Sequence, residues 1–215
     1  MEPVSLVFTA LELLGTVAFA ISGAMVAIQK RADIFGVLVL GVTTATGGGL
    51  MRDVLLGHLP PRLFENRLYL FVAAGAALAI FLVARVFQEK FLRRAALVDQ
   101  VNNLFDAVGL GAFTVTGIQT GIAAGYVGNR FLLVFLGVLT GVGGGLIRDL
   151  MVMEIPFVLR KRVYALAAIA GGLAYVFSQP LCRSHAVPVT LTLAVVVGLR
   201  LLATVFRWDL PKAIP

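Results

Sequence analysis

A seven-residue motif, Gly-Gly-Gly-x-x-Arg-Asp, occurs twice in this sequence, at residues 47–53 and again at residues 143–149. Both copies lie in apolar stretches, where ionisable side chains are costly and normally face a protein interior or a water-filled cavity. They are therefore candidates for the charged lining of a pathway through a membrane. These candidates are Arg52, Asp53, Arg148 and Asp149.

The two arginines need carboxylate partners inside an apolar segment. Neighbouring residues on a helix point about 100° apart, so the adjacent aspartate is not an ideal partner. We expect Arg52 to pair with Asp149 and Arg148 with Asp53, from one motif to the other. A purely structural ion pair that staples the two motifs together is the alternative.

The three successive glycines of each motif would weaken a helix, since each costs about 1 kcal/mol relative to alanine. Glycines at close helix crossings are usually four apart, whereas three in a row expose backbone on every face. Carbonyls freed at such a break can coordinate cations where they line a cavity. We predict that both helices break there, with close packing as the alternative; the hinge residues are Gly47, Gly48, Gly49, Gly143, Gly144 and Gly145.

Two further acids occupy equivalent places ahead of the motifs, Glu12 and Asp106. With Asp53 and Asp149 they give four acids against two arginines, an excess that favours cations if all are ionised. Buried carboxyls can instead be protonated, and threonines in such segments often bond back to their own helix. The possible lining residues are Glu12, Thr43, Thr46, Asp106 and Thr140.

The composition requires a bilayer around these motifs. The 215 residues are 60% hydrophobic and 13% charged, whereas soluble domains carry about 25% charged residues. Only helices and closed barrels cross a membrane, and long continuous apolar runs favour helices. We predict seven spans, the fourth being the most polar at its start; they run from about 5–28, 34–56, 67–87, 98–118, 129–151, 162–179 and 187–206.

The net charge of +7 reflects basic residues between the spans, which orient a membrane protein and give no reason to expect nucleic acid. Four basic residues fall on one side: Arg62, Arg67, Arg130 and Arg183. Twelve fall on the other: Lys30, Arg31, Arg85, Lys90, Arg93, Arg94, Arg160, Lys161, Arg162, Arg200, Arg207 and Lys212. The richer side is cytoplasmic by the positive-inside rule. We therefore expect a multi-pass inner-membrane protein with its amino terminus outside and its carboxyl terminus inside.

An internal repeat links these features. The motifs match at an offset of 96, and the segments that begin at Glu12 and Asp106 match at an offset of 94. The repeats cover about 5–87 and 98–179 within a single transmembrane domain, 1–215, and the seventh helix, 187–206, has no counterpart. Because three spans are an odd number, the second repeat enters the membrane inverted, as in many transport proteins.

The paired motif, the acid-x-x-Gly-x-x-Ala-Phe segment in each half and the three-plus-three-plus-one plan resemble the prokaryotic trimeric intracellular cation channels. That family is also labelled as glycine transporters. The resemblance covers nearly the whole chain. It implies a homotrimer with a pore through each subunit, lined by the first, second, fourth and fifth helices. It also implies conduction of potassium and sodium without a cofactor.

The expected function is therefore a passive channel for monovalent cations in the lipid bilayer. The sequence contains no nucleophile–base set, nucleotide motif or metal-ligand spacing, so we expect neither an enzyme nor a metal site. A secondary transporter of a small zwitterion such as glycine is the alternative, because half-helix ends can hold a carboxylate. A membrane scaffold without transport is a third reading.

Overall fold

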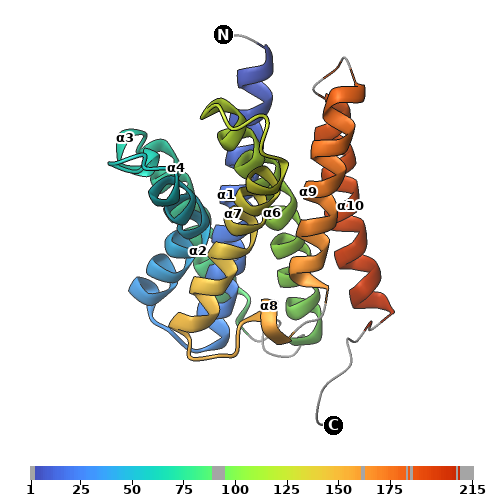
Figure 1. Cartoon of the computed structure of the whole chain (residues 1–215). Helices are drawn as coiled ribbons and strands as arrows, with labels where there is room; N and C mark the ends of the chain where they lie inside the picture. Colours follow the sequence, from blue (N-terminus) through green and yellow to red (C-terminus); the bar gives the residue numbers. More distant parts are fainter. Residues whose placement is uncertain are drawn as a thin grey trace.

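The computed structural model describes residues 3–88, 95–160, 163–182, 184, 186–206 and 208 (Figure 1). Every predicted span corresponds to a helix whose ends lie within a few residues of those expected. The long helices are α1 (Pro3–Gln29), α2 (Ile34–Leu55), α4 (Leu68–Val86), α6 (Ala95–Ala123), α7 (Arg130–Met151), α9 (Tyr164–Ser178) and α10 (Ala186–Val205). Short helical segments follow three of them: α3 (Arg62–Glu65), α8 (Phe157–Arg160) and the 3-10 turn η1 (Gln179–Leu181).

In the described chain, six of the long helices are long and apolar enough to cross a membrane, and α6 is the exception. Four polar residues crowd the first half of α6: Asp99, Asn102, Asn103 and Asp106. Its carboxyl end runs beyond the predicted limit, to Ala123, and polar side chains there find partners: Gln119 bonds Tyr175, and Thr120 bonds the carbonyl of Thr116. The chain is thus an all-α membrane protein.

Equivalent residues begin the two helices that carry the glycine motifs. The Asp33 carboxylate accepts a hydrogen bond from the backbone N–H of Gly36 at 2.8 Å, and the Asn129 side chain accepts one from Leu132 at 3.0 Å. A side-chain oxygen at this position satisfies a backbone donor that the first helical turn leaves free. The two caps are 96 residues apart, the same offset as the motifs.

Four helices, α1, α2, α6 and α7, form the centre of the bundle through the contacts α1–α2, α6–α7, α1–α6 and α2–α7. Helix α4 packs on α1 and α2, whereas α9 packs on α7 and α10 packs on α6 and α9 (Figure 1). Phe19 and Phe113, 94 residues apart, meet edge to face with ring centroids 5.2 Å apart. Their contact lies between the two halves of the bundle.

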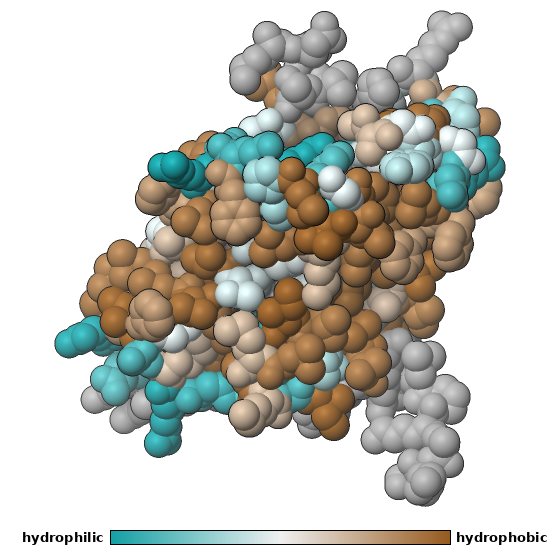
Figure 2. All heavy atoms as spheres, turned by 60° about the vertical axis from the view of Figure 1, so that its left-hand side comes forward, coloured by the Kyte–Doolittle hydropathy of each residue, from teal (hydrophilic) through white to brown (hydrophobic). Residues whose placement is uncertain are grey.

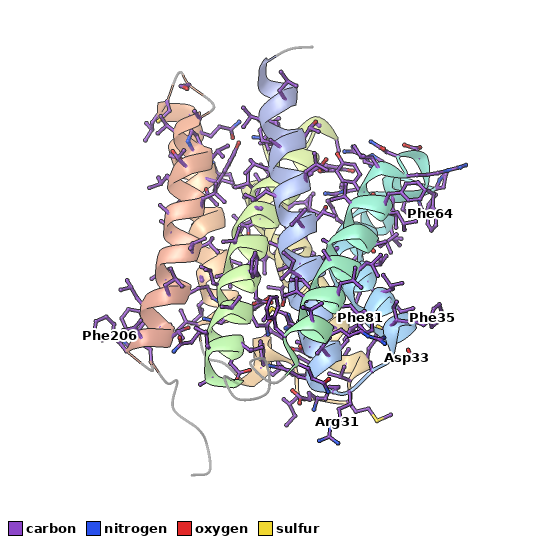
Figure 3. All side chains as sticks on the ribbon, turned by 180° about the vertical axis from the view of Figure 1, so that it is seen from behind. Arg31, Asp33, Phe35, Phe64, Phe81 and Phe206 are labelled. Carbon is purple, nitrogen blue, oxygen red and sulfur yellow. The ribbon has the colours of Figure 1, made fainter. Side chains whose placement is uncertain are left out.

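The outer surface suits a bilayer. Figure 2 shows hydrophobic side chains over the middle of one face, with hydrophilic side chains gathered towards its two ends. Phe35 and Phe64 are 72% and 64% exposed and point away from the bundle (Figure 3). Many large apolar side chains are exposed on this surface, which is expected where it contacts lipid.

The predicted breaks at the glycines are not seen, since α2 and α7 continue as α-helix through residues 47–49 and 143–145. The glycines instead permit the two helices to cross backbone against backbone. A methyl group on Gly48 would lie 2.0 Å from the carbonyl oxygen of Thr140, and one on Gly144 would lie 2.0 Å from that of Thr44. Only a residue without a side chain fits at such a crossing.

Candidate functional site

Each arginine of the motifs bonds the aspartate beside it. Arg52 Nε donates to Asp53 Oδ1 at 2.9 Å, and Arg148 Nε donates to Asp149 Oδ1 at 2.8 Å. The predicted pairing from one motif to the other is therefore wrong. The reason is that α3, which follows α2, and α8, which follows α7, lie towards opposite ends of the bundle (Figure 1).

The aspartates also fix the chain that follows each motif. Asp53 Oδ2 accepts the backbone N–H of Arg62 at 3.0 Å, and Asp149 Oδ2 accepts that of Phe157 at 2.7 Å. These residues begin α3 and α8. Both carboxylates are thus held in place on one side by a guanidinium and on the other by a short helix.

A cavity of about 250 Å³ occupies the first half of the molecule. Its wall at the α3 end includes Arg62 and Glu65, and its wall at the α2–α7 crossing includes Gly49, Thr140 and Phe113. The cavity therefore reaches from one end of the bundle to its middle. Its other polar lining residues are Glu12, Thr16, Thr46, Arg52, Asp53, Asn66 and Tyr69.

Glu12 lines this cavity and is held by a single hydrogen bond within the described structure. Its Oε2 accepts a hydrogen bond from the Tyr69 hydroxyl at 2.6 Å, and no ion pair joins it to a cation among the described residues. Asp53, by contrast, has both oxygens engaged. The lining contains three carboxylates and two guanidinium groups, so the cavity is net negative if all are ionised.

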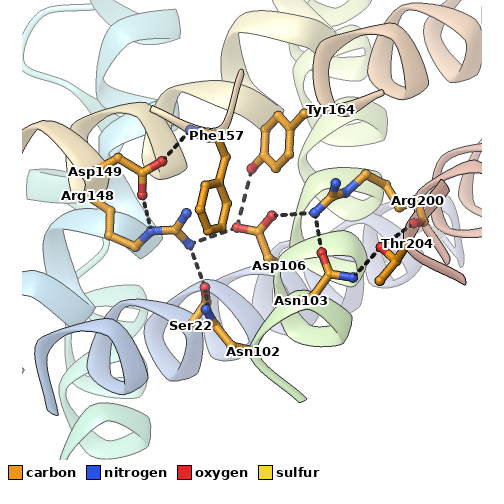
Figure 4. Close-up of polar contacts among 10 residues, drawn as sticks. All are labelled: Ser22, Asn102, Asn103, Asp106, Arg148, Asp149, Phe157, Tyr164, Arg200 and Thr204. Carbon is orange, nitrogen blue, oxygen red and sulfur yellow. Dashed lines mark hydrogen bonds and ion pairs between the residues drawn. The ribbon is translucent and has the colours of Figure 1, made fainter. Parts of the chain in front are cut away.

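The second half holds a buried charge network instead (Figure 4). Arg148, fully buried, donates from Nη1 to Asp106 Oδ1 at 2.8 Å and to Ser22 Oγ at 2.6 Å. Asp106, also fully buried, receives Tyr164 Oη at 3.3 Å on the same oxygen and Arg200 Nη2 at 3.4 Å on the other. Neither of the two central charges is exposed at the surface of the molecule.

Asparagines extend this network to α1 and α10. Ser22 donates to Asn102 at 2.8 Å, and Asn103 accepts Arg200 Nη2 at 2.5 Å while donating to Thr204 at 2.8 Å (Figure 4). Both asparagines are buried. They brace the interior of the bundle.

The structure thus separates the candidate residues into three groups. Glu12, Thr46, Thr140, Arg52 and Asp53 line or flank the cavity, with Gly49 beside them. Asp106, Arg148 and Asp149 belong to the network. The third group is the close crossing of α2 and α7, which contains Gly47, Gly48, Gly143 and Gly144. Gly145 faces Tyr164. Thr43 belongs to none of the three groups.

Two of the three threonines that line the cavity bond back to their own helices, Thr46 to the carbonyl of Val42 at 2.8 Å and Thr140 to that of Leu136 at 2.6 Å. A hydroxyl used in this way gives its proton to the helix and keeps its oxygen lone pairs, so it can still face a passing cation.

Sequence reasoning missed three important side chains. Tyr69 and Tyr164 are 95 residues apart, and each bonds the acid of its own half. Their nearly equivalent positions in the two repeats are the sequence feature that could have identified them. Arg200 was counted among the loop residues, yet it is 3% exposed inside α10. It changes the interior count to four acids against three arginines, and its place within an apolar run was the available signal.

Some expectations concern residues outside the described part of the chain. They are the basic residues Lys90, Arg93, Arg94, Lys161, Arg162, Arg183, Arg207 and Lys212. For the described residues, no group of three or more His, Cys, Asp or Glu side chains is placed to hold a metal ion.

Comparison with known proteins identifies the family. The profile described as "Glycine transporter" matches this chain twice, at residues 9–85 and 103–180. The chain therefore belongs to this family of multi-pass membrane proteins. It is 39% identical over 205 residues to the UPF0126 inner membrane protein YadS of Escherichia coli K12, covering 93% of this chain and 92% of YadS.

Solved channel structures share the fold over almost the whole chain. A TRIC cation channel solved to explain conductance superposes with a TM-score of 0.81 at 36% identity, covering 97% of this chain and 98% of that one. The TRIC trimeric intracellular cation channel orthologue from Rhodobacter sphaeroides superposes with a TM-score of 0.83 at 30% identity, covering 94% and 99%. These matches agree with the expectation of a channel and not an enzyme.

Proposed function

We propose that this protein is a channel for monovalent cations, potassium and sodium, with a pathway through each subunit. The observation that carries the proposal is the cavity, which reaches the middle of the bundle and presents the Glu12 carboxylate, a group with no ion-pair partner among the described residues. A net negative, partly desolvated cavity concentrates cations and repels anions. Its likeness to TRIC cation channels supports the same reading.

The pathway runs from the cavity, past the α2–α7 crossing, to the Arg148 network. Thr140 lies at the crossing, and Arg148 follows it eight residues later on α7, which is about 12 Å along a helix. Since Arg148 and Asp106 are fully buried, this structure represents a closed state. Opening then requires the network to separate or hydrate.

The motif residues take different parts in this pathway. Arg52 and Arg148 hold Asp53 and Asp149 in fixed positions, and Glu12 and Asp106 set the preference for cations. The glycines determine how closely α2 and α7 approach, and they act as hinges when the crossing loosens. The close contacts at Gly48 and Gly144 support this role, because any side chain there would push the two helices apart.

The assembly and orientation follow from the same reasoning. We infer two inverted three-helix repeats plus α10 within one transmembrane domain, seven crossings in all, which the two matches of one family profile support. The basic side faces the cytoplasm of an inner membrane, so the cavity opens outward and the network lies inward. A homotrimer agrees with the trimeric Rhodobacter sphaeroides orthologue, and the mass of the purified complex tests it.

Recording from purified protein in a planar bilayer, with potassium chloride at two concentrations, tests the channel. Discrete current steps carried by potassium are expected. A bilayer that stays silent, although correct insertion is verified by protease protection, contradicts it.

A glycine transporter is the second candidate, and two observations favour it. The family profile carries that description, and the cavity lining offers both Glu12 for an ammonium group and Arg52 and Arg62 for a carboxylate. Liposomes that accumulate radiolabelled glycine in a saturable, gradient-dependent way would establish this activity. Potassium currents without glycine uptake would remove it.

A further inference from the structure

Helix α10 has no counterpart in the first half, and its buried Arg200 reaches the charge network of the second half. Arg200 Nη2 lies 3.4 Å from Asp106 Oδ2 and donates to Asn103 Oδ1 at 2.5 Å. We propose that Arg200 keeps the inner half closed by cancelling the charge of Asp106, which otherwise forms a cation site equivalent to Glu12. The inference rests on the proposed channel function.

The two halves differ in charge by this one residue. Around the first acid stand Glu12, Asp53 and Arg52, with a net charge of −1 if all are ionised. Around the second acid stand Asp106 and Asp149 with Arg148 and Arg200, with a net charge of zero. A cation gains little by entering a neutral, dry cluster, whereas a residual negative charge attracts it.

Removal of Arg200 would also free a specific atom. Asp106 Oδ1 is occupied by Arg148 and Tyr164, and Oδ2 is occupied by Arg200. Without Arg200 the second acid keeps Arg148 and Tyr164 on one oxygen and has the other oxygen free. It then resembles Glu12 in having a tyrosine and one free oxygen, and differs from it in the guanidinium that remains. The carboxylate could then bind a cation that moves past it.

The hold of Arg200 on Asp106 is the looser of the two arginine contacts, at 3.4 Å against 2.8 Å for Arg148. The buried Nε of Arg200 has no partner within the described structure, and its guanidinium lies 4.7 Å from the centre of the Tyr164 ring. Tyr164 and Asn103 can therefore keep Arg200 when it leaves Asp106. Because α10 packs mainly on α6 and α9, a small movement of α10 withdraws the charge while α2 and α7 remain crossed.

Four variants of the full-length protein test this in planar bilayers. Arg200→Gln leaves a charge of −1 and is expected to raise the potassium current about three- to tenfold. Asp106→Asn leaves +1 and lowers the current. The double variant is neutral again, so its current rises above that of Asp106→Asn. Arg200→Lys, which keeps the charge, stays close to the unmodified protein.

A merely structural role for Arg200 predicts the opposite for the double variant, namely a loss at least as large as that of either single change. If Arg200→Gln alone does not fold, adding it to Asp106→Asn must still raise the current above that of Asp106→Asn. Failure of that comparison overturns the inference while leaving a conducting unmodified protein as a channel. If the unmodified protein and every variant are silent, the channel and the inference both fall.

Discussion

The first half and the second half place the same groups in the same order, yet one half contains a cavity and the other a closed network. In each, an arginine bonds the next aspartate, that aspartate caps a short helix, and a tyrosine bonds an acid of the first helix. The difference comes from the neighbours. The second half adds Asn102, Asn103 and Arg200, whereas Phe8 and Thr9 occupy the places equivalent to the two asparagines.

This comparison indicates that duplication provides a framework and that a few added polar groups decide where water enters. A buried carboxylate is stable only with partners that replace its water. Asp106 has them from three helices, α7, α9 and α10. Glu12 has one hydroxyl in the described structure, and the cavity provides the rest of its hydration.

The largest effect is expected for Arg148→Gln. It leaves Asp106 and Asp149 buried without their shared guanidinium, and breaking a buried ion pair in this way costs about 3–5 kcal/mol. The matched change Arg52→Gln costs less, because it leaves one carboxylate, Asp53, without its guanidinium, and not two. Thermal unfolding in detergent measures both, and equal losses would contradict the difference between the halves.

A second effect separates the glycines within one motif. Gly48→Ala and Gly144→Ala each place a methyl group 2.0 Å from a carbonyl of the opposite helix, and overpacking of this kind typically costs about 1–3 kcal/mol. Gly49→Ala is the matched control, since the nearest atom to its methyl group is 3.8 Å away.

Gly145→Ala sharpens the comparison between the halves, because its methyl group would lie 2.8 Å from the Tyr164 hydroxyl. It should therefore be more destabilising than Gly49→Ala at the equivalent position. Melting temperatures that fall equally for all four variants would show that the glycines do not act through this crossing.

The sequence predicts the helices well but not the contacts at the site. Hydropathy locates the spans because lipid exposure imposes long apolar runs, and the repeat aligns Arg52 with Arg148 and Glu12 with Asp106. Pairing between the motifs could not be predicted, since it depends on which end of the bundle each helix reaches. The breaks predicted at Gly48 and Gly144 rested on helix propensity, which does not include the packing energy that two helices gain when they cross closely.

The smallest effect is expected for the two tyrosines. Tyr69→Phe removes the 2.6 Å hydrogen bond to Glu12 and should cost about 1 kcal/mol. Tyr164→Phe removes a longer hydrogen bond, of 3.3 Å, to Asp106. Because Asp106 keeps its contact with Arg148, this change should cost about 0.5 kcal/mol or less. A greater loss for Tyr164→Phe in the same melting assay would mean that the network depends on its tyrosine more than the cavity does.

Glu12 is the acid through which the cavity contributes to cation preference, and the reversal potential of single-channel current in a potassium chloride gradient tests this role. The unmodified protein should reverse near the potassium equilibrium potential. Glu12→Gln, with the isosteric side chain, should reverse closer to zero and carry less current. An unmodified protein that reverses at the chloride potential, or a Glu12→Gln variant that reverses with the unmodified protein, would contradict the role of this cavity.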